Sequence, residues 1–225
     1  MKTTFYGHAT VGLEIGGKSL LFDPYITPNP LAKHIDINSL KPDYILISHG
    51  HGDHVADLEA IQKNSGAKVI CIAEIAGWLG NKGISNAHGM NIGGGFNFDF
   101  GHVKMVYALH SSSMPDGSYG GTPAGFVITA KDKKIYYAGD TALTYDMKLL
   151  ADEDIDWAIL PIGDNYTMGV DDAIKATDFI NCKNIIGIHY DTFPAIKIDK
   201  EAVREKFIKA GINIQLPEIG ESIDI

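Results

Sequence analysis

The feature of this sequence that most constrains its fold is an apolar run that stops in a cluster of histidines. Residues 44–48 are typical of a buried strand, and His49-Gly50-His51-Gly52-Asp53-His54 follows directly. Imidazole and carboxylate groups are ligands for divalent metals, and the two glycines leave the backbone free to bend so that the four side chains converge. Chance produces this H-x-H-x-D-H pattern in roughly one chain in a thousand of this length. The segment therefore predicts a metal site at a strand end.

Composition places the chain among ordinary globular proteins and excludes several function classes. It has 225 residues, of which 45% are hydrophobic and 21% charged. The net charge of −9, with 19 scattered lysines and arginines, disfavours a nucleic-acid partner, because binding a phosphate backbone relies on clustered positive charge. No segment approaches the roughly 20 apolar residues that span a membrane, and the first residues lack the apolar core of a signal peptide. We therefore expect a cytoplasmic protein.

The two cysteines, Cys71 and Cys182, are far apart, and each lies in an apolar or helical stretch. This placement favours two reduced, packed thiols over a disulfide or a pair of metal ligands.

The remaining pattern mixes hairpins with alternating strands and helices. We expect one hairpin turned at Gly16-Gly17 and another, formed by 96–100 and 103–109, turned at Gly101-His102. The expected helices cover 55–62, 73–79, 170–180 and 200–210. Further strands are expected at 68–72, 125–130, 135–138, 157–162 and 184–188, with edge strands at 212–215 and 222–225. No linker interrupts this order, so the simplest architecture is one layered α/β domain spanning residues 1–225.

Metal-competent side chains also follow three other expected strands. His110 follows 103–109, Asp140 follows 135–138, and His189 follows 184–188. Asn165 comes after 157–162 in the same way. Because loops converge over the ends of strands in α/β proteins, we expect these side chains to lie near the histidine cluster.

These residues together resemble the metallo-β-lactamase superfamily, and the order of ligands matches from about residue 3 to residue 189. The resemblance implies an αββα four-layer sandwich, in which helices flank two mixed sheets and a two-metal site lies on one edge. It implies that the first metal is held by His49, His51 and His110. It implies that the second is held by Asp53, His54 and His189, with Asp140 bridging the pair.

Shorter segments resemble a group of bacterial metal-dependent hydrolases within that superfamily. They are Tyr6-Gly7-His8-Ala9, Phe22-Asp23-Pro24 and residues 163–169. The group is similar to the ascorbate-6-phosphate lactonases and, more distantly, to phosphodiesterases that cleave phospholipids. The resemblance implies Zn²⁺ or Mn²⁺, and a histidine-rich site without cysteine also suits Fe²⁺ or Ni²⁺.

The chemistry expected of such a site is hydrolysis. Two divalent ions about 3.5–4 Å apart lower the pKa of a shared water, so that a bridging hydroxide exists near pH 7. Asp53 can accept a hydrogen bond from this hydroxide and carry its proton onward. The expected substrate is a small molecule with an ester, lactone or phosphodiester bond, and the lactonase resemblance places a lactone or phosphoester ahead of a β-lactam.

The neighbouring residues keep two interpretations each. His8 either contacts the substrate and protonates the leaving group or is a structural histidine. Asp23 either orients a metal-bound imidazole from behind or caps a turn. Asn165 and Tyr166 are expected to line the pocket, and loops 27–34 and 111–121 are either walls of the pocket or ordinary surface loops.

Three other functions are compatible with the same motif. The superfamily includes RNA-processing nucleases, but those generally add RNA-clamping insertions that this compact acidic chain lacks. Its di-iron oxidoreductases have glutamate where His51 stands and carry a flavin domain, for which this chain is too short. A non-catalytic metal-binding protein is the third alternative. The presence of all seven expected ligands argues against it. Relatives are often homo-oligomers, and the sequence leaves open whether this protein forms a homo-oligomer.

Overall fold

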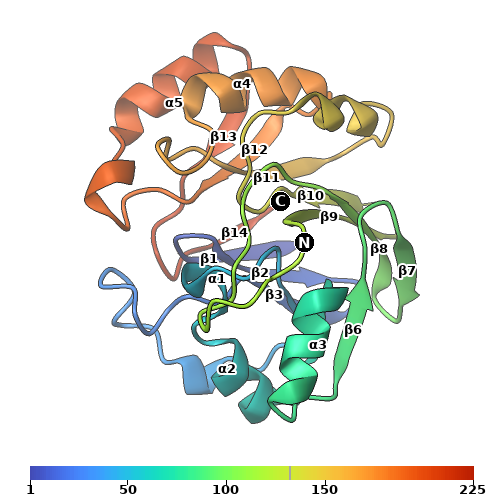
Figure 1. Cartoon of the computed structure of the whole chain (residues 1–225). Helices are drawn as coiled ribbons and strands as arrows, with labels where there is room; N and C mark the ends of the chain where they lie inside the picture. Colours follow the sequence, from blue (N-terminus) through green and yellow to red (C-terminus); the bar gives the residue numbers. More distant parts are fainter. Residues whose placement is uncertain (132) are drawn as a thin grey trace.

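The computed structural model describes residues 1–131 and 133–225 and shows two sheets packed face to face between layers of helices (Figure 1). The strands of the first sheet are β1 (Lys2–Gly7), β2 (Thr10–Ile15), β3 (Lys18–Phe22), β4 (Tyr44–Leu46), β5 (Lys68–Ile72), β6 (Ala87–Met90) and β14 (Ser222–Asp224). The strands of the second are β7 (Gly95–Phe98), β8 (Gly101–Tyr107), β9 (Ala124–Ala130), β10 (Lys133–Tyr137), β11 (Trp157–Pro161), β12 (Asn184–Ile188) and β13 (Asn213–Gln215).

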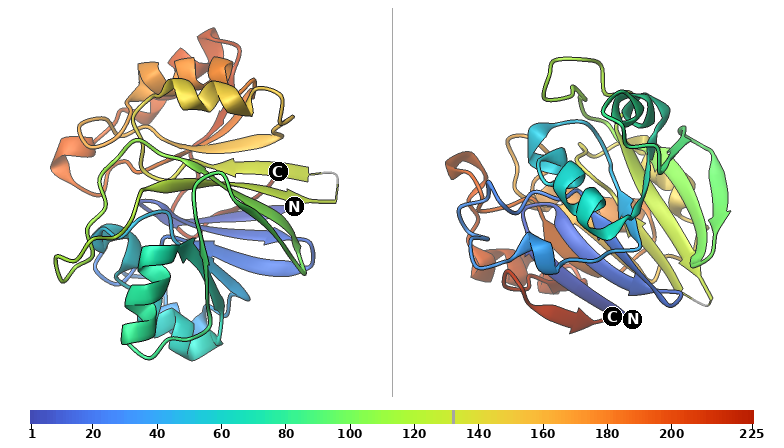
Figure 2. Two further views of the ribbon diagram at one scale, coloured as in Figure 1. Left: turned by 45° about the vertical axis from the view of Figure 1, so that its right-hand side comes forward. Right: turned by 90° about the horizontal axis from the view of Figure 1, so that it is seen from below.

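The helices form the two outer layers of the sandwich (Figure 2). The first sheet is covered by α1 (Gly52–Val55), α2 (Leu58–Ser65) and α3 (Ala73–Asn81), and the second by α4 (Val170–Phe179) and α5 (Lys200–Lys209). Short 3-10 turns lie at Ile37–Ser39, Tyr145–Leu150 and Pro194–Ile196. This arrangement confirms the expected αββα sandwich with two mixed sheets.

The two sheets have matching topologies. The first has the order β14-β1-β2-β3-β4-β5-β6 and the second β13-β12-β11-β10-β9-β8-β7. Strands β3 to β6 run parallel to one another, and so do β10 to β13, whereas the remaining pairs are antiparallel. Within each sheet the parallel strands therefore end at one common edge, where the loops that follow them meet.

The core lies between the sheets and under the helices. All residues of β4 are buried, as expected for a short strand covered on both faces. Phe22 of β3 stacks on Tyr137 of β10 with ring centroids 4.4 Å apart, which joins the sheets close to their loop-bearing edge. Burial of each such side chain contributes about 1.5–3 kcal/mol to stability. The frame beneath the loops is thus well packed.

Several element boundaries differ from those expected. The β7–β8 turn lies at Asp99-Phe100, whereas Gly101 and His102 open β8. Its position is set by the first sheet, because Tyr44 donates a hydrogen bond of 2.6 Å to Asp99 and its ring packs on Phe100. Strand β6 was not expected, since Ala87–Met90 has weak strand composition and is fixed by pairing with β5.

The helix expected at 55–62 is divided into α1 and α2. Asp57 lies at the break, where its carboxylate accepts the backbone N–H groups of Ile26 and Thr27. The Gly16-Gly17 turn and the edge positions of β13 and β14 are confirmed. Both cysteines are free and buried, also as expected. Within the described part of the chain, no helix is long and apolar enough to cross a membrane.

Candidate metal centre

The segments that follow the strands of both sheets converge at one edge of the sandwich. From the first sheet, His8 follows β1, Asp23 follows β3, and the motif beginning at His49 follows β4. From the second sheet, His110, Asp140 and His189 follow β8, β10 and β12. Side chains far apart in the sequence therefore meet at the junction of the two halves.

Their ligand atoms form two groups that share no residue, and in each group all atoms lie within 4.8 Å of one another. A third set, Asp23, His49 and His54, takes one histidine from each group. One group consists of His49, His51 and His110. The other consists of His8, Asp53, His54 and His189. The groups differ from the expected ligand sets only by the addition of His8.

Asp140 lies between the two groups. Its Oδ2 atom is 3.6 Å from Nε2 of His110, 3.3 Å from Nε2 of His54 and 3.0 Å from Nε2 of His189. Thr141 supports this position, because its hydroxyl accepts the backbone N–H of Leu109 and so joins the loop after β10 to the loop that carries His110. A single carboxylate oxygen thus faces imidazoles of both groups.

Asp23 is a fully buried acceptor behind the histidines. Oδ2 accepts hydrogen bonds from Nδ1 of His54 at 2.8 Å and from the hydroxyl of Tyr137 at 2.8 Å, and Oδ1 accepts the backbone N–H of Ser48. Because donors already occupy both oxygens, Asp23 orients His54 instead of offering a free lone pair. The Nε2 atom of His54 then points at Asp140.

The same carboxylate also fixes His49 through Ser48. The Ser48 hydroxyl donates its one proton to Asp23, so it accepts from Nδ1 of His49 at 3.0 Å. The Nε2 atom of His49 consequently carries a lone pair, and it lies 2.9 Å from Nδ1 of His51. One buried aspartate therefore sets the ring orientation of a histidine in each group.

His8 is buried behind Asp53 and is not among the described residues that line the cavity in front of the site. Its Nε2 lies 3.0 Å from Oδ2 of Asp53, and its Nδ1 lies 3.1 Å from the hydroxyl of Thr192. Burial and the neighbouring His189 lower the pKa of His8 to about 4. The neutral ring donates to the carboxylate and accepts from Thr192. Of the two interpretations of His8, this placement favours the structural, hydrogen-bonded histidine over contact with the substrate.

The backbone at His8 is also unusual. His8, Asp23 and His189 all have positive φ, at 54°, 42° and 58°, which is uncommon for residues with side chains. The carbonyl of His8 accepts the N–H of His189 at 2.7 Å. Strained residues of this kind cluster at functional sites, where surrounding contacts hold them in place.

The charges in the centre are opposed in a way that favours cation binding. Burial lowers the pKa of His49 well below its usual value and also lowers that of His110. Burial lowers the pKa of His54 too, but Asp140 and Asp23 together raise it well above its usual value. Burial raises the pKa of Asp140, yet His189 and His54 hold it well below. His49 and His110 are thus neutral beside the ionised Asp140, whereas His54 carries a proton that a bound cation would displace.

Unpaired buried atoms provide a direct test of whether a metal fits. Nε2 of His54, Oδ1 of Asp140 and Nδ1 of His189 are buried without a hydrogen-bond partner among the described residues. Buried polar atoms are normally paired, and leaving them unpaired costs about 1–3 kcal/mol each. Of these three atoms, Nε2 of His54 faces Asp140 in the middle of the cluster, where a divalent cation would coordinate it. The donor set of imidazole nitrogens and carboxylate oxygens suits such a cation.

The spacing between the halves is set by the backbone. The N–H of Ala124, at the start of β9, donates to the carbonyl of Ser48 at 2.9 Å, which ties the two sheets beside the site. Gly139 has a φ of 63°, and a Cβ atom there would lie 2.7 Å from that of Ser48. Only glycine allows this close approach of the loop that carries Asp140.

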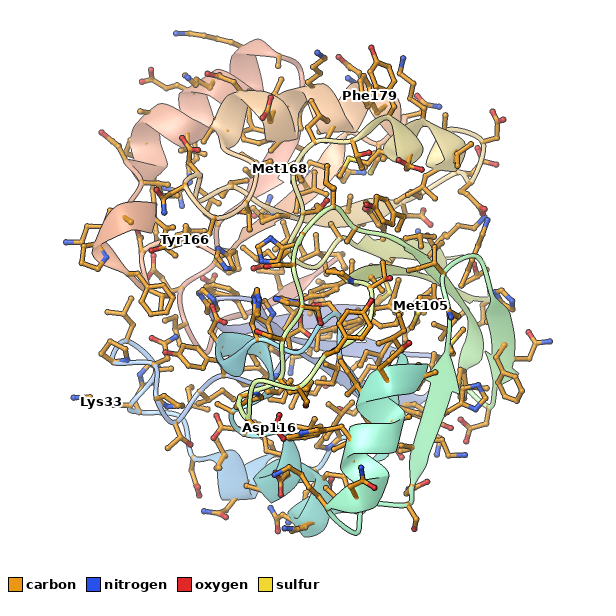
Figure 3. All side chains as sticks on the ribbon, viewed as in Figure 1. Lys33, Met105, Asp116, Tyr166, Met168 and Phe179 are labelled. Atoms are coloured by element: carbon orange, nitrogen blue, oxygen red, sulfur yellow. The ribbon has the colours of Figure 1, made fainter. Side chains whose placement is uncertain are left out.

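A cavity of about 640 Å³ opens in front of the centre. Its polar wall consists of His51, Asp53, His110, Ser111, Asp140 and His189. Tyr25, Tyr166 and Phe193 form an aromatic wall. Tyr166 lies on the loop-bearing side between the upper and lower helices (Figure 3). Asn165, which was expected to line the pocket, is exposed next to Tyr166 and does not line this cavity.

The two expected loops differ in their contribution. Loop 111–121 crosses from the second half to the first, where Trp78 of α3 donates a hydrogen bond of 2.6 Å to Asp116 (Figure 3). It also packs on the histidine motif, since Gly50 N–H donates to the Ser112 hydroxyl. Loop 27–34 contributes no lining residue to this cavity among those described.

The sequence did not single out Tyr25, Phe193 or Thr192. Tyr25 comes two residues after Asp23, and Phe193 four residues after His189. Applying the strand-end argument to whole loops instead of single side chains would have included all three.

Comparison with known proteins identifies the family. Residues 18–190 match the β-lactamase superfamily domain. A UPF0173 metal-dependent hydrolase of Flavobacterium johnsoniae is 56% identical over the full length of both chains. The structure of Igni18, a metallo hydrolase of Ignicoccus hospitalis, is 35% identical, has a TM-score of 0.89 and covers 99% of this chain and 97% of its own. The metallo-β-lactamase fold protein YhfI from Bacillus subtilis, at 15% identity, a TM-score of 0.74 and coverage of 99% and 98%, shows the shared fold. The chain therefore belongs to the UPF0173 metal-dependent hydrolases of the metallo-β-lactamase superfamily.

Proposed function

We propose that this protein hydrolyses an ester, lactone or phosphodiester bond in a small molecule with the aid of two divalent metal ions. The observation that carries the proposal is Asp140, whose Oδ2 lies within 3.6 Å of imidazole nitrogens from both ligand groups. His49, His51 and His110 would hold one ion, and Asp53, His54 and His189 the other. Zn²⁺ or Mn²⁺ is the proposed metal, and a pair of such ions activates water at neutral pH and polarises the bond to be cleaved.

The side chains on the cavity side have distinct proposed roles. His51, Asp53 and His110 are the less buried members of the set, so substrate would approach from their side. The pKa of Asp53 is raised by burial but lowered more by the His8 hydrogen bond and by His54, which keeps its carboxylate ionised. An ionised Asp53 can accept a proton from the attacking water and deliver it to the leaving oxygen.

His8 is proposed as a positioning residue. It holds Asp53 by Nε2 while Thr192 holds its other nitrogen, so the carboxylate cannot rotate away from the cavity. Its carbonyl simultaneously fixes the backbone at His189. This role replaces the contact with substrate that the sequence suggested.

The finer substrate expectation from the lactonase resemblance remains part of the proposal. It places lactones and phosphoesters ahead of β-lactams, and a cytoplasmic location fits a metabolite of this kind. The formal charge of −9 continues to disfavour RNA or DNA as substrates.

The test is to prepare the metal-free protein, load it with Zn²⁺ or Mn²⁺, and measure both metal content and hydrolysis of ester, lactone and phosphodiester panels. We expect about two ions per chain and activity in at least one panel. Removal of the metal should lower the melting temperature by roughly 5–10 °C, because an ion that binds only the folded chain stabilises it.

Matched histidine variants provide the control. His51→Ala and His110→Ala should lower the metal content, whereas His102→Ala, at the start of β8 and outside the centre, should leave it at the wild-type level. Stoichiometric metal binding without hydrolysis in any panel would favour the non-catalytic alternative. Cleavage of RNA that Asp53→Ala abolishes would favour a nuclease.

A further inference from the structure

The cavity in front of the centre has an uneven distribution of charge. Asp53 and Asp140 lie on its polar wall. None of the 19 lysines and arginines is among the described residues that line it, and the sequence contains no others. Lys33, on the neighbouring loop, points outwards from the molecule (Figure 3). Apart from bound metal, the cavity therefore offers no cationic group.

This absence restricts the part of a substrate that lies away from the metals. A phosphate or carboxylate group that is not itself cleaved needs arginine, lysine or a suitable array of N–H donors to replace its hydration. The two carboxylates of the lining, Asp53 and Asp140, are assigned to the metal ions, and the described lining has no lysine or arginine for a second anionic group. Transfer of such a group from water into the cavity would therefore be uncompensated.

The aromatic part of the lining suits a flat apolar group. Tyr25 follows β3, Tyr166 follows β11 and Phe193 follows β12, so three separate loops contribute one ring each. The rings of Tyr25 and Phe193 are in contact at 6.4 Å between centroids, and both pack against His8 at 5.4 Å. The rings of Tyr25 and Phe193 are therefore held in place by their contacts with His8.

Tyr166 contributes the third aromatic ring of the cavity lining. Its side chain is 54% exposed, and it makes no side-chain hydrogen bond among the described residues. An exposed aromatic ring beside a catalytic cavity contributes little to folding but can cover an apolar ligand.

From the lack of a cationic side chain and from the aromatic lining we infer that the substrate is a neutral ester or lactone with an aromatic or similarly flat apolar group, which packs against Tyr166 and the Tyr25–Phe193 pair. This inference rests on the proposed function and narrows it. It separates this protein from lactonases of phosphorylated sugars, for which the cavity has no cationic partner.

The test compares three lactones with the metal-loaded enzyme: dihydrocoumarin, a ring-carboxylated dihydrocoumarin, and γ-butyrolactone. We expect kcat/KM for dihydrocoumarin to exceed that for its carboxylated form by at least about 10-fold, because the lining has no cationic side chain to replace the hydration of the carboxylate. Tyr166→Ala should lower kcat/KM for dihydrocoumarin by about 10-fold but that for γ-butyrolactone by less than about 2-fold, because the small ring does not reach the aromatic wall.

Tyr145→Ala is the matched control, since Tyr145 is 75% exposed and lies outside the cavity. It should behave as the wild type with all three lactones, and the metal content of both variants should be unchanged. Preference for the carboxylated lactone, or an equal effect of Tyr166→Ala on all substrates, would overturn the inference.

A binding measurement separates this inference from the proposed function. 1-Tetralone and a carboxylated tetralone resemble the two bicyclic lactones but have no bond to hydrolyse, and their binding can be measured by calorimetry. Tighter binding of neutral tetralone, weakened by Tyr166→Ala, supports the inference even if no lactone is hydrolysed. Tighter binding of the carboxylated compound rejects the inference even if hydrolysis is found.

Discussion

The two halves of the sandwich build their share of the metal centre in different ways. The first half supplies His49, His51, Asp53 and His54 from one segment of six residues after β4, the last three of which belong to α1. The second half supplies His110, Asp140 and His189 singly, from three loops after β8, β10 and β12. One contribution is a local motif, whereas the other exists only once three strands lie side by side.

The support behind the ligands differs as well. In the first half, Asp23 orients His54 directly and His49 through Ser48. In the second half, Nδ1 of His189 is buried without a partner among residues 1–131 and 133–225, and that residue is held by its backbone hydrogen bond to His8. The first half therefore positions its ligands through side-chain hydrogen bonds, and the second through the conformation of the main chain.

Substitution of the residue that faces both ligand groups should have the largest effect. Asp140→Asn keeps the size of the side chain but removes its negative charge between the two groups. We expect the hydrolytic rate to fall by about 10³-fold, because several kcal/mol of charge stabilisation are lost, and the metal content to fall below two per chain. Retention of both metals and of wild-type activity would show that the halves bind their ions independently.

Removing the side-chain support of the first half should have the next largest effect. Asp23→Asn replaces an acceptor of several hydrogen bonds with a group that presents an N–H₂ to other donors. We expect metal affinity to fall by about 10–100-fold, which is typical when the partner of a metal-bound histidine is lost. Competition with a chelator measures this affinity. Asp43→Asn, at an exposed ion pair with Lys18, is the control and should not change it.

These differences explain how much of the protein could be predicted from its sequence. Strands β5 and β12 lie where they were expected, because each is a continuous apolar run that ends at a sharp polar boundary. The turn at Asp99-Phe100 was misplaced, since it is fixed by Tyr44 from the other sheet and not by local turn residues. Long-range contacts of this kind leave no local pattern.

The same limit applies to the candidate site. The cluster after β4 can be recognised as a motif. His110, Asp140 and His189 can be found because each is a metal-competent residue shortly after an expected strand. The sequence could not show that His8 lies behind Asp53, because this depends on how the β1–β2 turn packs on the loop after β12. Nor could it show that Tyr166 faces the cavity while its neighbour Asn165 does not.

His8 joins the two halves, so its replacement should have an intermediate effect. His8→Ala removes the hydrogen bond to Asp53, and we expect kcat to fall by about 10-fold while KM changes little. His8→Gln can donate one hydrogen bond from a similar position, so it should recover part of kcat. Equal losses in the two variants, accompanied by equal losses of melting temperature, would indicate that the role of His8 is only structural.

The smallest expected effect is on the rate at which the buried cysteine of each half becomes exposed to a thiol reagent. Cys71 lies in β5 of the first half and Cys182 just before β12 of the second, and both are buried. Burial raises the pKa of Cys71 to about 12 and also raises that of Cys182, so both thiols stay protonated at pH 8. We expect slow reaction of the native protein with an aromatic disulfide reagent. Chelation should accelerate both cysteines by a few-fold, and acceleration of one alone would show which half the metals stabilise.

The hydrogen bond from Ala124 to Ser48 and the absence of a side chain at Gly139 bring the two sheets into contact beside the site. This contact sets the distance between the two ligand groups. Because the main chains are already in contact there, we expect that an ion of small radius cannot draw the two sheets closer together. We therefore expect the scaffold, as well as the ligands, to influence which metal binds, and we expect a bulkier residue at position 139 to change that preference without altering any ligand.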